Sequence, residues 1–581
     1  MFYLLLPLQF LCVTPWLNEP INLARSLVLV FAVTIFVLAK PEVLKAKSKF
    51  MYLLLLLPGI YVISALANKQ NPVLALLGNY NRNFGVLTFI AIGLLVLIAA
   101  NSKSNAISFI NYGVWPITAL AVIYSYMQSF NIDPLAWAEP DRTVLTMGNS
   151  DFAAAFMGML IVVPLYGFFA YSNRLIKASM VPLLLLIANA GMNSIAFQFR
   201  VLALISVIVF IIVFYWEKLA RLPKPLTIGA LFASITLLIF YVLYNQKDLI
   251  AYTNFKDRIS QQKMGLSMFA DHPIFGVGAD QMWRYMPMYL KPSDIVINGS
   301  DVVPDKTHNV FIDHLAQGGI IAGLIFTVFI VFSLIIVFQL MRKSQSKENR
   351  PLIALLAGIW VSYVAQQFIS TDQVVLMIMP FMAFGLMCKL YFSEDVAMSS
   401  AQKKSTNNNS NLPIRGATSV LLLIISIVGG QAIYYDSQVK KILTRQIMNG
   451  DIALSTIKDF PNPKTTEAII VDAMTNLQNC PFALAATDEL LKVDDRSAQA
   501  WYIKTICVDS TGDRKSALDL VDKAIVLQPI NLRYLEAKFK LMASMGDFTG
   551  ASSVLDTMKS INPNLSNLDD LEALLKIPAT K

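Results

Sequence analysis

Two of the three histidines in this chain lie in one short stretch, KTHNVFIDHLAQGG, at residues 306–319. They are His308 and His314, and the third is His272. A neutral imidazole accepts a proton near neutral pH, so this stretch is a candidate source of a general base. On a helix, residues six positions apart point about 240° apart, so the two rings would not share a face. A two-histidine metal site is therefore not expected, and no metal ligands are predicted.

Cationic side chains are spread over the segments that precede this stretch. Arg82 lies in GNYNRNFG, Arg200 begins a long apolar run, and a long polar segment carries Arg258, Lys263 and Arg284. The planar guanidinium suits a phosphate group because it donates two parallel hydrogen bonds. Arginines at a membrane boundary are costly unless they pair or face a polar cavity. Their number therefore indicates a site for an anion.

We predict one site that combines these side chains. His308 would take a proton from an attacking hydroxyl, and the arginines would neutralise a pyrophosphate leaving group. The predicted pyrophosphate-binding residues are Arg258, Arg200 and Arg82, and the predicted supporting residues are Asn309, Lys263, Arg284 and His314. Each of these residues also has a structural alternative. The arginines could anchor at lipid headgroups or extend toward them. His308 could cap a helix, and His314 could be a core residue.

The composition indicates which elements must position these residues. Hydrophobic residues make up 56% of the 581 residues and charged residues only 15%, with a mean hydropathy of +0.56. Ordinary soluble proteins carry about a quarter charged residues. The sequence therefore predicts an all-α, polytopic membrane protein. GVG at 276–278 lacks the context of a nucleotide-binding loop, and neither a cofactor nor a nucleic-acid partner is predicted.

Thirteen apolar stretches predict membrane helices of about 20 residues. The N-terminal MFYLLLPLQFLCVTPW lacks a basic start and a cleavage site, so it is predicted to be the first of them. The predicted spans are residues 2–17, 21–39, 51–67, 84–100, 107–129, 152–172, 179–195, 199–216, 225–244, 319–341, 352–370, 373–391 and 416–435. The predicted domains are a membrane domain at 1–392, with a large external loop near 245–318, a linker at 393–415, the thirteenth helix, and a tail at 440–581.

Basic residues predict the orientation. Clusters of lysine and arginine follow the second, sixth, eighth and tenth predicted helices, which places those loops in the cytoplasm. The clusters are Lys40, Lys45, Lys47 and Lys49; Arg174 and Lys177; Lys218, Arg221 and Lys224; and Arg342, Lys343, Lys347 and Arg350. The N-terminus is then cytoplasmic, whereas the loops at 68–83, 130–151 and 245–318 face outward and carry His308. Thirteen spans also place the tail outside the cytoplasmic membrane.

The tail contains a repeat of 34 residues. Turn-forming and small residues recur at this interval: Gly512-Asp513 and Gly546-Asp547, Ala517 and Ala551, and Pro529 and Pro563. A helix–turn–helix unit of this length resembles tetratricopeptide repeats, which present concave surfaces. The alternative is an irregular helical bundle. We expect the tail to dock a partner or position a substrate, so that its deletion alters acceptor choice more than donor hydrolysis.

The tail also holds two of the four cysteines. Cys480 precedes a predicted helix at about 482–492, and Cys507 lies late in the next, at about 497–510. In an antiparallel helix pair these positions come close, and an external location would permit a disulfide. Cys12 and Cys388 are expected to face lipid or the core.

Several motifs resemble the O-antigen ligase and O-antigen polymerase superfamily. DHPIFGVGADQMWRY followed by THNVFIDHLAQGGIIAGL resembles its P-x-x-G-x-G element, its H-N pair and its Gly-Gly, while GNYNRNFG, GNSDFAAAF and QQFISTDQ resemble further elements. The resemblance covers residues 70–392.

The resemblance implies a helical bundle of about a dozen spans. The bundle would transfer a glycan from undecaprenyl pyrophosphate to an acceptor hydroxyl at the outer face of the cytoplasmic membrane, without a metal. By the resemblance, His308 would be catalytic and Arg258 would bind pyrophosphate. Arg200 departs from the pattern, since the family often has Ser-Arg followed by small residues.

The acceptor separates the functions that the sequence allows. A ligase or protein O-oligosaccharyltransferase would transfer the glycan to a lipid, a protein or another glycan, whereas a polysaccharide polymerase would transfer it to a second lipid-linked repeat unit. A transporter of lipid-linked sugars should carry charges along the middle of several spans, but here they gather toward the predicted outer side. A scaffold for envelope assembly would act mainly through the tail and its protein partners.

Overall fold

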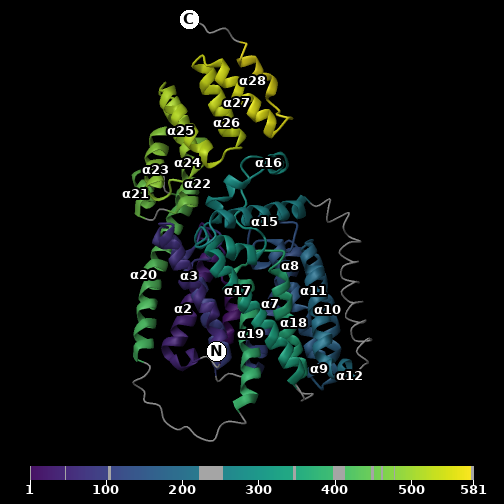
Figure 1. The fold of residues 1–581 in the computed structure, drawn as a ribbon. Coiled ribbons are helices and arrows are strands. Elements are labelled where there is room, and N and C mark those ends of the chain that lie inside the picture. The colour runs from purple at the N-terminus through teal and green to yellow at the C-terminus, as the bar shows by residue number, and fades with distance from the viewer. Residues whose placement is uncertain are drawn as a thin grey trace.

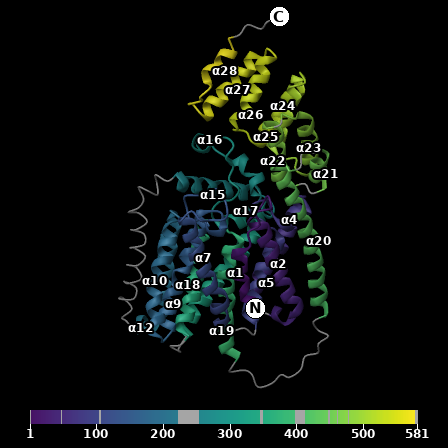
Figure 2. The ribbon, with the colours of Figure 1, turned by 180° about the vertical axis from the view of Figure 1, so that it is seen from behind.

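The computed structural model describes residues 2–45, 48–102, 106–221, 253–343, 349–396, 412–446, 450–459, 462–476 and 478–576. All regular elements in these ranges are helices, which confirms the predicted all-α class. The helices form a bundle of apolar elements and a tail that lies beyond one end of the bundle (Figures 1 and 2).

The bundle and the segments at its tail-facing end comprise most of the helices. They are α1 Leu5–Leu11, α2 Asn22–Ala39, α3 Leu53–Ala67, α4 Pro72–Leu77, α5 Val86–Asn101, α6 Ala106–Phe109, α7 Trp115–Ser129, α8 Ser150–Leu160, α9 Val162–Ala170, α10 Arg174–Met192, α11 Phe197–Phe214, α12 Trp216–Arg221, α15 Thr253–Asp271, α16 Pro292–Asn298, α17 Val310–Lys343, α18 Arg350–Gln366, α19 Val374–Val396 and α20 Leu412–Leu443.

Nine helices in the described ranges are long and apolar enough to cross a membrane, and three shorter apolar helices accompany them. These nine and three, twelve in all, match twelve of the thirteen predicted spans. The thirteenth, at 225–244, lies outside the described residues. The protein is therefore a multi-pass membrane protein, as its composition predicts.

The first predicted span, residues 2–17, is wrong in its extent. The helix ends at Leu11, and ten residues rise only about 15 Å, half of a bilayer core. Arg25 explains the early end: its buried guanidinium donates to the backbone carbonyls of Gln9 (3.0 Å) and Phe10 (3.3 Å). These carbonyls have no partner further along a helix, so the arginine satisfies them where the helix stops.

The predicted external loop, 245–318, contains helices of its own. In Figure 1, α15 lies across the end of the bundle that faces the tail. The predicted span 319–341 is only the second part of α17, which begins at Val310 and changes direction at Gly319 (φ +69°). Its predicted start is wrong because the polar stretch before Gly319 already forms helix, with Asn309 capping the first turn through its side-chain oxygen.

Helix α20 connects the bundle to the tail. It packs against α2 at the outside of the bundle and continues toward the tail (Figures 1 and 2). It begins before and ends after the predicted span 416–435, while most of the predicted linker, residues 397–411, lies outside the described residues.

The tail consists of short antiparallel helices. They are α21 Gly450–Asp459, α22 Pro463–Thr475, α23 Cys480–Val493, α24 Ala498–Asp509, α25 Arg514–Leu527, α26 Leu532–Ser544, α27 Phe548–Ile561 and α28 Leu568–Leu574. Helices α23, α25 and α27 begin at residues 480, 514 and 548, each 34 residues after the one before. Asp513 and Asp547 cap α25 and α27 in the same way. The helices thus recur at the interval found in the sequence, and their assignment to tetratricopeptide repeats stays a prediction.

A disulfide joins α23 to α24. It links Cys480 to Cys507, whose Cα atoms lie 5.4 Å apart. The bond fits the antiparallel pairing expected from the sequence. Cys388 is buried in the bundle and Cys12 is half-buried.

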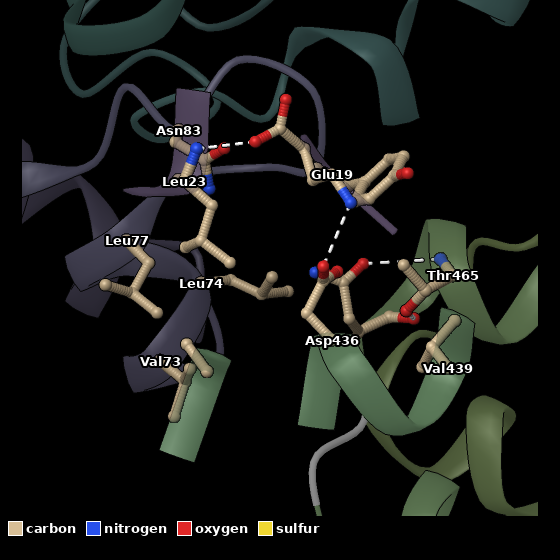
Figure 3. Close-up of a pocket in the computed structure, with 13 residues that line it drawn as sticks. Glu19, Leu23, Val73, Leu74, Leu77, Asn83, Asp436, Val439 and Thr465 are labelled. Atoms are coloured by element: carbon tan, nitrogen blue, oxygen red, sulfur yellow. Dashed lines mark hydrogen bonds between the residues drawn. The ribbon is translucent and has the colours of Figure 1, made fainter. Parts of the chain in front are cut away.

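The tail is tied to the bundle at several points. The backbone N–H of Glu19 donates to the Asp436 carboxylate on α20 (2.9 Å), and both residues line a small cavity shown in Figure 3. Farther along, Arg284 pairs with Asp494, and Asp301 pairs with Arg533. The segment between α15 and α17 is therefore held from both sides, by the bundle and by the tail.

These two tail contacts should differ in strength. Asp494→Ala should weaken docking of the tail by about 3 kcal/mol, because it leaves the nearly buried Arg284 without its charge partner. The matched variant Asp301→Ala should cost less than about 1 kcal/mol, because both side chains of the Asp301–Arg533 pair are exposed. Hydrogen exchange of residues 283–300 measures the difference. Equal protection in both variants would mean that Arg284 does not secure this segment.

Candidate functional site

The histidine at the centre of the predicted site lies in a tight turn before α17. His308 has a left-handed backbone conformation (φ +55°), which non-glycine residues seldom adopt. The neighbouring residues fix the turn: the Thr307 hydroxyl donates to Asp313 (2.7 Å), and Asn309 caps α17. A strained backbone held by several hydrogen bonds is typical of a functional position.

His308 is held by a side chain of α15. Its Nδ1 lies 2.7 Å from Oε1 of Gln261. An amide oxygen only accepts hydrogen bonds, so Nδ1 must carry the proton and Nε2 keeps its lone pair. Burial, together with the charges of Arg258 and Arg82, lowers the pKa of His308 to about 3, against an opposing effect of Asp305. The imidazole is therefore neutral at physiological pH.

Arg258 lies one turn before Gln261 on the same face of α15. Its guanidinium pairs with Asp151, at the first turn of α8 (2.5 Å), and donates to the backbone carbonyl of Ile369 (2.9 Å). The Gln198 amide nitrogen donates hydrogen bonds to Asp151, and the Gln198 amide oxygen accepts one from the Ser370 hydroxyl. About a fifth of the Arg258 side chain stays exposed, so a ligand can reach it.

Arg82, from the loop between α4 and α5, supplies a second guanidinium. It forms a two-pronged ion pair with Asp305 (2.7 and 3.0 Å) and donates to the Thr371 hydroxyl (3.3 Å). Burial alone would raise the pKa of Asp305, but Arg82 outweighs it and holds that pKa far below its ordinary value. The Arg82 side chain is as exposed as that of Arg258.

One loop contacts both arginines. The segment between α18 and α19 offers the Ile369 carbonyl to Arg258 and the Thr371 hydroxyl to Arg82. The same segment accepts a hydrogen bond from the first helical N–H of α17, since Val310 donates to the carbonyl of Gln367 (2.8 Å). QQFISTDQ therefore holds both cations and the start of the helix that follows His308.

The glycine motifs clamp the large loop onto α17. The backbone N–H groups of Val277 and Gly278 donate to the carbonyls of Ala316 and Gln317 (2.9 Å each). A Cβ on Gly276 would lie 2.4 Å from the carbonyl carbon of Gln317, and one on Gly319 would lie 2.1 Å from the carbonyl oxygen of Ile274. The two motifs thus need glycine because their backbones touch.

Substitution at this contact should be severe. Gly319→Ala should destabilise the bundle by at least about 2 kcal/mol, because the φ of +69° and the backbone contact both exclude a Cβ. Gly430→Ala, in an open position on α20, is the control and should be neutral or stabilising. Thermal unfolding in detergent compares them. A Gly319→Ala protein as stable as Gly430→Ala would show that the two segments are not in backbone contact.

A buried ion pair extends the clamp to the first external loop. Lys306 lies 2.7 Å from Asp280, and both side chains are almost fully buried. The other oxygen of Asp280 accepts from the backbone N–H groups of Asn79 (2.7 Å) and Phe84 (3.2 Å). The loop that carries Arg82 is thereby fixed to the residue two positions before His308.

The structure places the other predicted site residues elsewhere. Arg200 lies on the exposed face of α11, while Gln198, almost opposite on the helix, faces Asp151. Lys263 is exposed on α15. The guanidinium of Arg284 pairs with Asp494 of the tail, and its role in the site stays a prediction.

His314 is a core residue. Its Nδ1 lies 2.5 Å from the Tyr61 hydroxyl, and the rings of Phe89 and Phe326 surround it. It is therefore directed away from the site, as the structural alternative anticipated.

Sequence reasoning missed the groups that hold the arginines and the histidine. These are Asp151, Gln261, Asp305, Ile369 and Thr371. Four of them lie inside or next to the motifs GNSDFAAAF, KTHNVFIDHLAQGG and QQFISTDQ, so the motifs were a signal for these four. The motifs do not show which residues pair, because the partners lie between 47 and 289 residues apart and no fixed spacing relates them.

Asp372 is a further candidate in this region. It accepts hydrogen bonds from the Tyr363 hydroxyl and the Gln367 amide (2.9 Å each). Burial raises the pKa of Asp372 to about 6, and these two hydrogen bonds oppose the rise. A carboxyl with such a pKa is poised to exchange a proton near neutral pH.

Taken together, the site brings two partly exposed guanidiniums to a neutral histidine with a free Nε2. No curated protein matches the sequence. Residues 199–327 match the family model Wzy_C, described as O-antigen ligase. This segment contains Arg258, the glycine motif and His308, and the match supports a membrane glycosyltransferase of the ligase or polymerase type. The chain is therefore a multi-pass membrane protein whose residues 199–327 are similar to the O-antigen ligase family.

Proposed function

We propose that the protein transfers a glycan from undecaprenyl pyrophosphate to an acceptor hydroxyl at the outer face of the cytoplasmic membrane. The observation that carries this proposal is the placement of Arg82 and Arg258 near a neutral His308. Two guanidiniums match a diphosphate, since each can donate two hydrogen bonds to phosphate oxygens.

The arginines would bind the leaving group. Asp305 and Asp151 hold the two guanidiniums in the absence of donor. The exposed part of each guanidinium can accept phosphate oxygens while its carboxylate keeps it oriented. When the bond between the anomeric carbon and the phosphate oxygen breaks, its electron pair goes to the pyrophosphate, whose growing charge the arginines stabilise.

His308 would activate the acceptor. Its Nε2 takes the proton of the acceptor hydroxyl as that oxygen attacks the anomeric carbon from the face opposite the pyrophosphate, with inversion. Arg258 and Arg82 help to keep the pKa of His308 low in the free protein. A bound diphosphate is an anion and offsets their charge, so donor binding raises the pKa of His308 and makes it a stronger base.

The orientation of the bundle supports an external reaction. Helix α12, with Lys218 and Arg221, lies at the end of the bundle opposite the tail, whereas α15 lies at the tail end (Figure 1). By the positive-inside rule the basic end is cytoplasmic. The site and the disulfide-bonded tail then share the external side, where disulfides persist.

A reconstituted transfer assay tests the proposal. The full-length protein in lipid nanodiscs, given undecaprenyl-pyrophosphate-linked glycan, should release undecaprenyl pyrophosphate and form a new glycosidic bond. The acceptor that receives the glycan, whether lipid, protein, glycan or a second lipid-linked unit, distinguishes a ligase from a polymerase. Activity should persist in excess EDTA, because arginines supply the positive charge. Loss of activity with EDTA and recovery with a divalent ion would overturn the metal-free mechanism.

A further inference from the structure

A groove lies between the first external loop and the tail. Its volume is about 530 Å³, within the range of about 300–1,000 Å³ typical of ligand sites. Tyr80 and Asn81 line it from the membrane domain, and α22 and α24 line it from the tail. Its polar and aromatic residues include Tyr80, Asn81, Lys464, Glu467, Asn476 and Gln499. The groove exists only because the tail docks on the membrane domain.

Tyr80 lines both this groove and the cavity shown in Figure 3, and its ring is fixed in place. Its hydroxyl accepts from the Asn18 amide (2.8 Å) and donates to the Asn18 backbone carbonyl (2.7 Å). With the hydroxyl held there, the ring cannot turn freely. The apolar C–H face of a sugar ring packs on such an aromatic face, while amides and carboxylates bond to sugar hydroxyls.

The charges in the groove oppose one another. The lining includes the cation Lys464 and the carboxylates of Glu467 and Asp472, and Asp472 is paired with Arg445, which is not in the lining. Glu467 is itself held by the Ser497 hydroxyl. A lining without a net excess of cations does not suit a phosphate, but it suits a neutral, polyhydroxylated chain.

The groove borders the loop that carries Arg82. Asn81, in its lining, directly precedes Arg82 in the chain. Lys464 contributes to the low pKa of Asp305, the partner of Arg82, so its ammonium lies within electrostatic range of that ion pair. The groove is therefore next to the part of the candidate site that Arg82 supplies.

We propose that the groove binds a glycan chain beyond the sugar that reacts, with Tyr80 as its stacking platform and the α22 side chains as its hydrogen-bonding wall. The proposal rests on the proposed function and extends it to a second subsite. The chain can belong to the donor or to the acceptor, since both carry the same chemistry.

Site-directed photocrosslinking tests this subsite directly. The probe is p-benzoyl-phenylalanine in place of Ala468, an exposed α22 residue that lines the groove, in the full-length protein in its own cells. The matched control carries the probe in place of Ser552, exposed on α27. After irradiation we expect a glycan-bearing adduct at 468 and none at 552. Absence of a glycan adduct at 468 in folded, membrane-inserted protein overturns the proposal.

Acid treatment of the adduct identifies the source of the chain. Mild acid cleaves a glycosyl pyrophosphate, so an adduct of a lipid-linked glycan, whether donor or lipid-linked acceptor, releases its lipid diphosphate, whereas an adduct of any other acceptor keeps its composition. Crosslinking needs no turnover. A glycan adduct in a protein that transfers nothing would therefore refute the proposed function and leave the subsite standing. Transfer without a glycan adduct would refute the subsite and leave the proposed function standing.

Filling the groove provides the kinetic counterpart. Ala468→Trp should raise KM for the glycan that occupies the groove about tenfold with kcat unchanged, because binding away from the reacting bond is lost. Donors or acceptors that carry a single sugar should be unaffected. Ser552→Trp should behave as wild type. Unchanged KM values for all long glycans in Ala468→Trp would contradict the subsite.

Discussion

His308→Ala should lower the rate of glycan transfer by about 10²–10⁴-fold, the usual contribution of a general base. The side chain is held by Gln261 with its Nε2 free, and Ala removes that acceptor without touching the cap at Asn309. His308→Gln should be as inactive, because an amide does not take a proton. Transfer is measured at saturating donor and acceptor, and membrane insertion and thermal stability are measured in parallel.

The control for this variant is His272→Ala. His272 lies in the same segment between α15 and α17, with its ring against Tyr285, outside the contacts of the site. It should keep wild-type activity. Full transfer by His308→Ala, or equal loss in both variants, would exclude His308 as the base.

The pH dependence of the wild type gives a second reading of the same role. In the free protein the pKa of His308 is about 3, so kcat/KM should not decline through this group until pH falls close to that value. In the donor complex the diphosphate raises the pKa, so the acidic limb of kcat should lie at higher pH than that of kcat/KM. If the acidic limbs of kcat and kcat/KM lie at the same pH, the charge of the bound donor does not change the pKa of His308.

Arg258→Lys should raise KM for the lipid-linked donor by roughly 10–100-fold, the cost of about 1.4–2.8 kcal/mol of lost binding. The guanidinium bonds Asp151 and the Ile369 carbonyl at the same time and still exposes part of its fork. An ammonium keeps the charge but cannot hold both partners and a phosphate in one plane. KM for the acceptor should change little.

Arg142→Lys is the matched control. Arg142 lies in the loop between α7 and α8, and its guanidinium forms a long contact with Glu139 (3.8 Å). Its variant should use the donor as the wild type does. If Arg258→Lys also shows wild-type donor kinetics, Arg258 does not recognise phosphate.

The membrane helices were predictable because their signal is local. About 20 apolar residues in a row indicate a span wherever they occur, and α2, α5 and α10 lie close to their predicted ranges. The extent of α1 was not predictable, since it depends on Arg25, which lies beyond a turn in the next helix. The start of α17 was misplaced for a related reason: its first turns are polar and are stabilised by Asn309 and Thr307 rather than by lipid.

The candidate site was likewise predictable from the sequence only in part. Its charged residues could be named from type and motif, and the structure brings Arg82, Arg258 and His308 into electrostatic contact. It does not bring Arg200 or Arg284 there, because the direction of a side chain on α11 and the docking of the tail are tertiary properties. The partners Asp151, Asp305 and Gln261 were missed since each lies on a different element from the group it holds.

The backbone contact between Gly276–Gly278 and Ala316–Gly319 has a consequence for the way this protein can change over generations. The chain leaves that contact and returns to it at neighbouring points. Within it, the buried ion pair between Asp280 and Lys306 closes a loop at residues 281–305, and lengthening such a loop costs little, about 0.6 kcal/mol for each doubling. Lineages can thus insert residues in the middle of this loop without displacing the His308 imidazole, provided that the tail surface that meets the loop changes as well.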